Sequence, residues 1–301
     1  MDNTLYFHIG YHKTATTLLQ KNFFSKNDST ALLNDFKNPW SDDLVSHLVK
    51  PSLRSFSKER FRQILMEKTK NNKAKKLVVS SERLSGQPSS GGFDNFIIAD
   101  RIKSAFPNAK VIIGIRNQKS MILSMYKQLV HEGYRGSIES MLTENYWQIP
   151  SFSKEYLEYD LLLQKYFDLF GAENVLVLPY EQLRKQPEVY FSRLTNFLEI
   201  APVDINEITS AQVNVSKNHS YLIIRRFLNH VRKTELNPTP IFDLKTKNIN
   251  LLTRVVSKLT PFISDYSLSN DLKEEIEQYY QQSNKRLKIL LPDLDLKDYL
   301  S

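Results

Sequence analysis

Short apolar runs alternate along the chain with stretches that have the periodicity of amphipathic helices. The runs are rich in β-branched and aromatic residues and predict strands at residues 5–9, 76–80, 110–115 and 175–178. The run at 110–115 is almost continuously apolar, which is typical of a strand buried on both faces of a parallel sheet. The alternation therefore predicts an α/β fold in which helices flank a central, mostly parallel sheet.

The last third of the chain has a different pattern. After Pro202 no strand is predicted, Pro238-Thr239-Pro240 indicates a break or an exposed loop, and helical spacing is found at residues 221–233, 251–259 and 268–291. A chain of 301 residues is long enough to bury a substantial core. We predict one domain over residues 1–301, with a core of about 1–202 and a helical C-terminal region of about 203–301.

The first predicted strand leads into a turn suited to binding an anion. Gly10 ends the strand, and a helical pattern begins at the threonines that follow Lys13. Amides at the start of a helix point at a ligand, and the helix dipole favours negative charge there. Lys13 and the threonine hydroxyls complete a site of phosphate size. The predicted contacts are Gly10, His12, Lys13, Thr14, Ala15, Thr16 and Thr17.

This turn differs from the Walker A loop of nucleoside triphosphatases, G-x-x-x-x-G-K-[ST]. After Gly10 that loop requires glycine at position 15 and lysine at position 16, where this chain has Ala15 and Thr16. A nucleoside triphosphatase of the usual kind is therefore disfavoured. Alanine at position 15 suits a close approach of the backbone to a phosphate if its φ is negative, and it is strained if the loop requires a positive φ.

A second candidate site follows the third predicted strand, which ends at Arg116. In an open α/β sheet the carboxyl ends of the strands face the crevice where ligands bind. Ser124 comes eight residues after Arg116, about two turns along the helix predicted for residues 118–131. We predict that Arg116 and Ser124 bind one phosphate together.

These two segments resemble the phosphate-binding motifs of sulfotransferases that use 3′-phosphoadenosine 5′-phosphosulfate (PAPS). The first resembles P-K-[ST]-G-T-T-x-L, with His12 and Ala15 in place of the proline and the glycine. The second resembles R-[ND]-P-x-x-x-x-x-S-x-Y, with Gln118 in place of the proline. A third segment, 175–198, is similar to the family's pattern of a strand, Y-E-x-L and a helix, which implies that Tyr180 lies near the nucleotide. The resemblance covers about residues 5–200.

The resemblance implies a P-loop-like three-layer fold and a sulfotransferase. PAPS would be the donor substrate, its sulfuryl group would move in line to a hydroxyl or, less readily, an amine, and adenosine 3′,5′-bisphosphate would be released. No metal is expected, because a sulfonate carries less charge than a γ-phosphate. Lys13 is the predicted catalytic cation, since a lysine beside the bridging oxygen stabilises charge on the leaving phosphate.

The acceptor hydroxyl also requires a base. Glu82 follows the strand at 76–80, so it lies at the same carboxyl edge of the sheet as Lys13, and partial desolvation there would raise the pKa of its carboxyl group. The structural alternatives for Glu82 are an ion pair with Arg83 and a helix-capping carboxylate, and His12 is the rival base. Carbohydrate sulfotransferases commonly use a glutamate base, so the chain is closest to that group and its predicted acceptor is a glycan or glycolipid. Trp40 and Trp147 are candidates for stacking on a sugar.

Charge is unevenly distributed. The formal net charge is +8, and residues 217–258 contain nine basic and two acidic side chains. On the helix predicted there, Arg225, Arg226, Arg232 and Lys233 form either a solvated face or a surface for an anionic donor, acceptor or membrane. The resemblance makes Lys217 a further candidate contact for the 3′-phosphate. Nucleic-acid binding is not predicted, because no recognised module accompanies the basic charge. The lysine-rich connection at 68–76 is predicted to be solvated.

The chain has no cysteine, which excludes disulfides and thiolate chemistry. It shows no signal-peptide pattern and no apolar run that could span a bilayer, so a cytoplasmic location is expected. Two other functions stay open at this point. One is a P-loop kinase that uses ATP and Mg²⁺, and the other is a non-catalytic binding protein with a nucleotide-binding fold.

Overall fold

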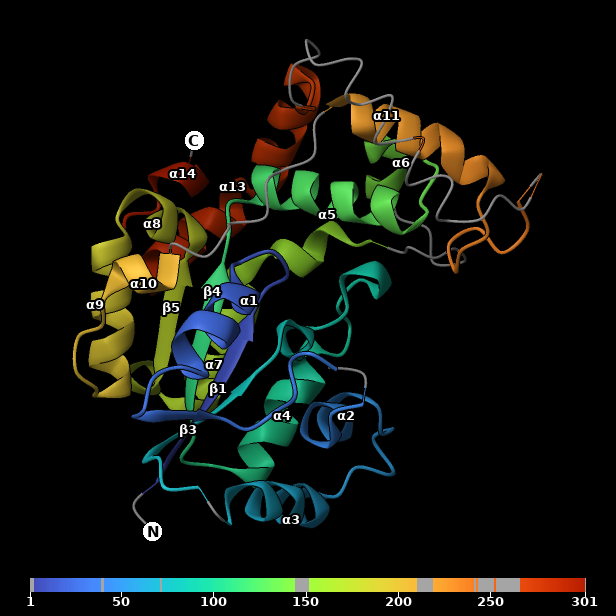
Figure 1. The fold of residues 1–301 in the computed structure, drawn as a ribbon. Helices are drawn as coiled ribbons and strands as arrows, with labels where there is room; N and C mark the ends of the chain where they lie inside the picture. The colour runs from blue at the N-terminus through green and yellow to red at the C-terminus, as the bar shows by residue number, and fades with distance from the viewer. Residues whose placement is uncertain are drawn as a thin grey trace.

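The computed structural model describes residues 3–38, 41–70, 72–143, 152–209, 219–240, 242, 252 and 266–300. Within these residues a five-stranded, wholly parallel sheet has helices on both faces (Figure 1). The strand order is β2-β3-β1-β4-β5. The strands are β1 Thr4–Gly10, β2 Thr30–Leu32, β3 Lys76–Ser80, β4 Lys110–Ile115 and β5 Val175–Pro179. The predicted α/β fold is confirmed.

Both faces of the sheet are buried, because successive side chains of a strand point to opposite sides. In β1, Phe7 and Ile9 pack into the larger core, whereas Tyr6 packs into the smaller one. Helices of the larger core are α2 Asp43–Val49, α3 Lys58–Thr69, α4 Asn95–Ala105, α5 Gln118–Glu132, α6 Ile138–Leu142, α7 Tyr159–Phe170, α11 His219–Leu228, α13 Asn270–Leu290 and α14 Lys297–Leu300. The smaller core contains the π-helical segment η1 Leu19–Phe24, α8 Tyr180–Lys185, α9 Pro187–Leu198 and α10 Ile205–Thr209.

Shorter helical turns connect these elements. They are α1 Thr16–Leu18, η2 Glu82–Ser85, η3 Pro88–Ser90, η4 Lys154–Leu157, η5 Ala172–Asn174 and η6 Asn229–Val231. α7 ends at Gly171, whose φ of 83° is a conformation that glycine adopts without strain. α5 begins after Asn117, whose side chain accepts a hydrogen bond from the backbone N–H of Ser120 at 3.2 Å.

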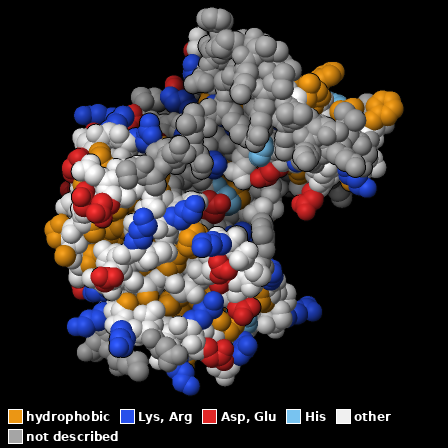
Figure 2. Space-filling model, in the orientation of Figure 1, with side chains coloured by type: hydrophobic (Ala, Val, Ile, Leu, Met, Phe, Trp, Pro, Cys, Tyr) orange, Lys and Arg blue, Asp and Glu red, His pale blue; other side chains and the backbone are white. Residues whose placement is uncertain are grey.

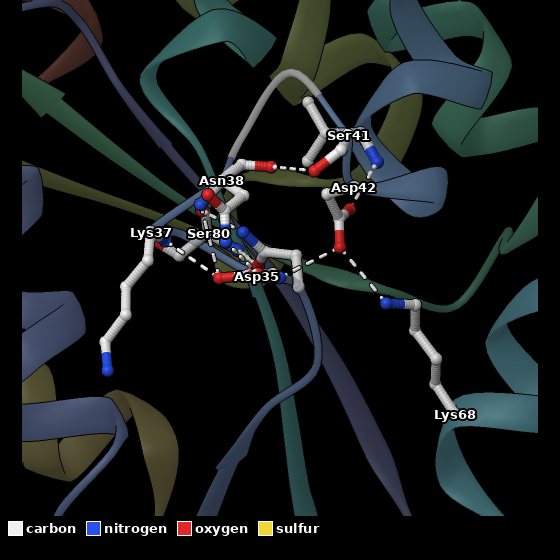
Figure 3. A network of polar contacts seen from close by, with 9 residues as sticks. Asp35, Lys37, Asn38, Ser41, Asp42, Lys68 and Ser80 are labelled. Atoms are coloured by element: carbon white, nitrogen blue, oxygen red, sulfur yellow. Dashed lines mark hydrogen bonds and ion pairs between the residues drawn. The ribbon is translucent and has the colours of Figure 1, made fainter.

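The strand β2 has no counterpart among the predicted strands, because its three residues are too few to show a period. The chain that follows β2 is fixed by side chains instead. Asn34 bonds both backbone groups of Ser80, at 2.7 and 2.9 Å, and so continues the β2–β3 ladder by one step. Asp42 then caps α2 and accepts hydrogen bonds from the Asp35 N–H and from Lys68 Nζ, at 2.8 and 3.1 Å (Figure 3).

The prediction that the 68–76 connection is solvated is wrong at both of its ends. Lys68 pairs with Asp42, and Lys76 pairs with Glu199 at 2.8 Å. Glu199 also accepts from Lys110 at 2.8 Å, so one carboxylate joins the first residues of β3 and β4. Hydrogen bonds from Lys110 and Lys76 lower the pKa of Glu199 to about 2.

The helix α11 packs on α5 through part of the predicted basic face. Arg225 is buried and donates to the backbone carbonyl of His131 at 3.3 Å, and Arg226 donates to the hydroxyl of Tyr126 at 3.3 Å. The sequence predicted that Arg225 lies on a solvated face or on an anion-binding surface. Both alternatives are wrong for this residue, because its guanidinium is buried and bonds within the protein.

Two other features of the C-terminal region can be compared with the sequence. Pro238 and Thr239 are exposed, as predicted, and an isolated antiparallel bridge pairs Thr234 with Asn237 just before them. The helix predicted at 251–259 lies almost entirely outside the described residues.

None of the described helices combines the length and the hydropathy needed to cross a bilayer. The division into a core and a C-terminal region of one domain stays a prediction.

Candidate phosphate-binding and catalytic site

The three strands at the centre of the sheet bring the predicted site segments to one edge. β1 lies between β3 and β4, and all three run in the same direction. Their carboxyl ends are followed by the Tyr11–Ala15 turn, by Glu82 and by Arg116, respectively. β1 is also the point at which the strand order reverses, which is where open α/β sheets bind ligands (Figure 1).

The turn after β1 contains two residues in the left-handed conformation, Lys13 with a φ of 67° and Ala15 with a φ of 68°. Alternation of left- and right-handed residues turns successive N–H groups toward the same side and forms an anion-binding concavity. A left-handed alanine costs about 1–2 kcal/mol relative to its preferred conformations. The sequence left open whether Ala15 has a negative or a positive φ, and the structure has the positive, strained one.

The threonines of this turn are not equivalent. Thr14 is buried, and its hydroxyl donates to the backbone carbonyl of Tyr11 at 2.6 Å. Thr16 is buried as well, but its Oγ1 has no hydrogen-bond partner among the described residues. Thr17 is exposed. A buried, unpaired hydroxyl costs about 1–3 kcal/mol, so the Oγ1 of Thr16 suits a ligand oxygen bound in the turn.

Two glycines make room for these threonines. Gly10 and Gly114 are partners in the β1–β4 pair. A Cβ atom on Gly10 would lie 2.3 Å from Thr16 Oγ1, and a Cβ on Gly114 would lie 2.8 Å from Thr14 Oγ1. Any larger residue at either position would force the turn away from the strand ends. Gly10 thus contributes to the shape of the turn, because it has no side chain to displace Thr16.

Arg116 connects the two candidate phosphate-binding segments. Its Nη1 donates to the backbone carbonyl of Lys13 at 3.1 Å, and its Nε donates to Ser120 Oγ at 2.9 Å. The guanidinium also lies 4.6 Å from the ring centroid of Tyr180, at the start of α8, in a cation–π contact. The structure therefore brings Lys13, Arg116 and Tyr180 together.

Ser124 lies one helical turn beyond Ser120 in α5 and is half-buried. Within α5, Arg116 donates a hydrogen bond to Ser120, which the sequence did not single out. The joint binding of one phosphate by Arg116 and Ser124 stays a prediction, and so does the nucleotide contact of Tyr180.

Both candidate bases lie side by side. The Nδ1 of His12 is 3.5 Å from Oε1 of Glu82, and the Glu82 side chain is 44 % exposed against 16 % for His12. Burial lowers the pKa of His12, and the Glu82 carboxylate opposes that effect. Arg83 pairs with Asp94, so the predicted alternative of a Glu82–Arg83 ion pair is not what the structure contains.

Two buried polar residues of the site were missed in the sequence. His8 stands in β1 on the same face as Gly10 and approaches Ser80 Oγ at 2.7 Å through Nδ1; burial lowers the pKa of His8 to about 3. Gln20 donates to the Ser80 carbonyl at 2.7 Å and so joins the end of β3 to the helical segment after the turn. The period of two along β1 places His8 beneath the turn and is the signal that could have identified it.

Glu181 is a third residue that was missed. Its Oε1 accepts from the backbone N–H of Asn117 at 3.0 Å, and its Oε2 accepts from the hydroxyl of Tyr299 at 2.8 Å. The glutamate of the Y-E-x-L segment thus fixes the residue that follows Arg116 and connects it to α14.

Lys and Arg side chains are spread over the visible face in Figure 2, and some of them lie in the region where Figure 1 has α1, with acidic side chains beside them. The part of the chain that the structure describes contains no group of three or more His, Asp or Glu side chains placed to hold a metal ion. Trp40, Trp147 and Lys217 lie outside the described residues.

The first of three similar solved structures supports the fold. A sulfotransferase from Alicyclobacillus acidocaldarius is similar with a TM-score of 0.60 and 16 % identity, over 99 % of each chain. The sulfotransferase domain of the curacin biosynthetic pathway has a TM-score of 0.48 and 15 % identity over 94 % of this chain and 98 % of its own. Mouse sulfotransferase SULT7A1, solved in complex with PAP, has a TM-score of 0.49 and 12 % identity over 96 % and 86 %.

No curated protein sequence matches this one. A family model described as the sulfotransferase family does match, over residues 7–204, which is well over half of the chain. The match includes the turn after β1, Glu82, Arg116 and the segment that contains Tyr180. The chain therefore belongs to the PAPS-dependent sulfotransferase family, as the resemblance of its two phosphate-binding segments implies.

Proposed function

We propose that this sulfotransferase moves the sulfuryl group of PAPS to a hydroxyl of a glycan or glycolipid, with Glu82 as the base and Lys13 as the catalytic cation. An amine is the less favoured acceptor. The observation that carries the proposal is the hydrogen bond from Arg116 to the carbonyl of Lys13, because it joins two phosphate-binding segments at one sheet edge.

The donor would be held at both of its phosphate ends. The amides from His12 to Thr17 and the unpaired hydroxyl of Thr16 suit the 5′-phosphosulfate. Arg116 and Ser124 suit the 3′-phosphate, since a guanidinium offers two parallel N–H donors to such a group. Tyr180, whose ring contacts the Arg116 guanidinium, would lie beside the nucleotide.

Lys13 would act on the leaving group. Its side chain is exposed at the mouth of the turn, while its backbone is fixed by Arg116. A flexible ammonium can strengthen its contact with the bridging oxygen as negative charge develops there. Such a contact lowers the barrier more than it tightens donor binding.

Glu82 would accept the acceptor's proton. As the acceptor oxygen bonds to sulfur, the bond from sulfur to the 5′-phosphate oxygen breaks, and the electron pair of that bond remains on adenosine 3′,5′-bisphosphate. The proton of the hydroxyl moves to the Glu82 carboxylate. The exposed fraction of the Glu82 side chain leaves it accessible to an acceptor.

Three finer statements belong to this proposal. The choice of a glycan or glycolipid rests on the glutamate base. A cytoplasmic location fits a donor that is made inside cells. Contact with an anionic membrane surface rests on the basic charge of residues 217–258, where five of the nine basic side chains lie outside the described part of the chain.

A P-loop kinase is the alternative enzyme, and it predicts consumption of ATP with Mg²⁺. The absence of a lysine at position 16 disfavours it. A non-catalytic binding protein is the other alternative. It predicts binding of adenosine 3′,5′-bisphosphate without transfer to any acceptor.

Transfer from radiolabelled PAPS to a panel of glycans, glycolipids, simple alcohols and amines tests the proposal. We expect Lys13→Ala to lose about 10²- to 10³-fold in turnover and Glu82→Gln to lose about 10²-fold or more. Lys26→Ala, which removes another exposed lysine, is the matched control. Full activity of both site variants would refute the assignment, and transfer to amines alone would refute the hydroxyl acceptor.

A further inference from the structure

We propose that His12 is a positioning residue for Glu82: its Nδ1–H donates to the Glu82 carboxylate and holds that carboxylate toward the acceptor hydroxyl. The inference rests on the proposed function, because it takes Glu82 as the base. It also decides between the two candidate bases, since His12 keeps its proton while Glu82 receives one.

The two side chains come from neighbouring strands. His12 belongs to the turn after β1 and Glu82 begins η2 directly after β3, and β1 and β3 are hydrogen-bonded neighbours. Their Nδ1 and Oε1 atoms lie 3.5 Å apart, which is longer than an ordinary N–H···O hydrogen bond. Contacts of this kind in catalytic sites commonly shorten when substrates bind.

Access separates the roles of the two residues. The Nε2 of His12 is buried and has no hydrogen-bond partner among the described residues, whereas nearly half of the Glu82 side chain is exposed. A hydroxyl that arrives from solvent therefore reaches Glu82 and does not reach Nε2. An acceptor proton therefore meets the Glu82 carboxylate before it could reach the buried Nε2 of His12.

The Glu82 carboxylate selects the tautomer. With the proton on Nδ1, His12 donates to the carboxylate. With the proton on Nε2, the Nδ1 lone pair would face that negative carboxylate across 3.5 Å, which is unfavourable. The first arrangement is the favourable one.

The charge of His12 matters for the strength of the base. The charged groups that act on it are Glu82 and Arg83 of η2 and Lys13 of its own turn. Burial has the largest effect and lowers the pKa of His12; Arg83 and Lys13 lower it as well, whereas Glu82 and a backbone hydrogen bond with Gly86 raise it. A neutral imidazole orients Glu82 without an adjacent positive charge, which would make the carboxylate a weaker proton acceptor.

Three substitutions test the hydrogen bond. His12→Asn keeps an N–H donor near the place of Nδ1, His12→Leu has the same branching without a donor, and His12→Gln moves the donor one bond further out. The rate is measured as release of adenosine 3′,5′-bisphosphate from PAPS, with water as the acceptor. We expect the leucine and glutamine variants to lose roughly 10- to 100-fold relative to the asparagine variant. Equal rates for asparagine and leucine would overturn the proposal.

Calorimetric binding of adenosine 3′,5′-bisphosphate to each variant separates this effect from a misfolded turn. The proposal predicts that the rate differences among the three variants exceed their differences in affinity. If rate and affinity fall in parallel, His12 only shapes the turn and the proposal is wrong.

A spectroscopic experiment needs neither donor nor acceptor and is therefore independent of the proposed function. Nitrogen-15 labelling of the histidines, with His12 assigned from its loss in the asparagine variant, reports the protonated nitrogen directly. We expect a neutral His12 with its proton on Nδ1 at neutral pH, and a change of tautomer in Glu82→Ala but not in the control Glu67→Ala. A proton on Nε2, or a charged ring, would overturn the proposal. Failure of the wild type to release the bisphosphate would contradict only the proposed function.

Discussion

Arg116 donates a hydrogen bond to the backbone carbonyl of Lys13 at 3.1 Å, across 103 positions of the sequence. The same guanidinium bonds Ser120 and stacks on Tyr180. Arg116 therefore supplies charge to the site and also fixes the backbone of the turn that carries Lys13, the proposed catalytic cation. Its planar shape should matter as much as its charge.

The substitution Arg116→Lys tests this double role. A lysine keeps the charge but loses the separate N–H groups that reach Lys13 and Ser120, so we expect the affinity for adenosine 3′,5′-bisphosphate to fall about tenfold or more. Calorimetry measures the loss. Arg54→Lys, at an exposed position, is the control. Wild-type affinity in Arg116→Lys would mean that charge alone is required.

The predicted contact of Ser124 with the 3′-phosphate can be separated from its place in α5. We expect Ser124→Ala to weaken the binding of adenosine 3′,5′-bisphosphate by roughly tenfold, as for the loss of a hydrogen bond to a charged group. The binding of adenosine 5′-phosphate should be unaffected. Ser104→Ala in α4 serves as the control for an exposed helical serine. Equal weakening of both nucleotides would show that Ser124 acts only through the helix.

Ala15 offers a test of strain in the turn. Glycine adopts a φ of 68° without the penalty of a Cβ, so we expect Ala15→Gly to raise the free energy of unfolding by about 1 kcal/mol. Urea denaturation measures it. Ala99→Gly, inside α4, should instead destabilise by about 1 kcal/mol or more. No stabilisation in Ala15→Gly would contradict the left-handed conformation of this residue.

Much of this arrangement could be predicted from the sequence, because it depends on periodic apolar patterns. Four strands have clear runs, and parallel strands place their carboxyl ends at one edge, which is sufficient to bring the Gly10 turn, Glu82 and Arg116 together. Neither the sequence of β1 nor that of β3 predicts that these two strands pair. The contact between His12 and Glu82 therefore appears only in the structure.

Other features depend on tertiary packing that a local pattern does not contain. Residue identity gives no sign that Lys13 and Ala15 are left-handed, since neither is glycine. Thr14 turns inward because the carbonyl of Tyr11 is within its reach. The burial of Arg225 follows from the packing of α11 on α5, whereas the sequence of its own segment predicts a basic, solvated surface.

Glu199 gives the fold a pH dependence. Its pKa is lowered from 4.5 to about 2 by Lys110 and Lys76, so its contribution to stability is fully present above about pH 4.5 and is lost as the pH falls toward 2. We expect Glu199→Gln to lower the melting temperature at neutral pH and to have a vanishing effect near pH 2. Glu67→Gln is the control. An effect of equal size at both pH values would contradict the role of the two lysines.

Calorimetric titration of adenosine 3′,5′-bisphosphate and of ATP, without metal, into the wild type and Arg116→Ala tests the donor site. We expect micromolar binding of the bisphosphate, about −8 kcal/mol, together with weaker binding in the variant and no binding of ATP. Preference for ATP with Mg²⁺, or equal binding of the bisphosphate by both proteins, would contradict this expectation.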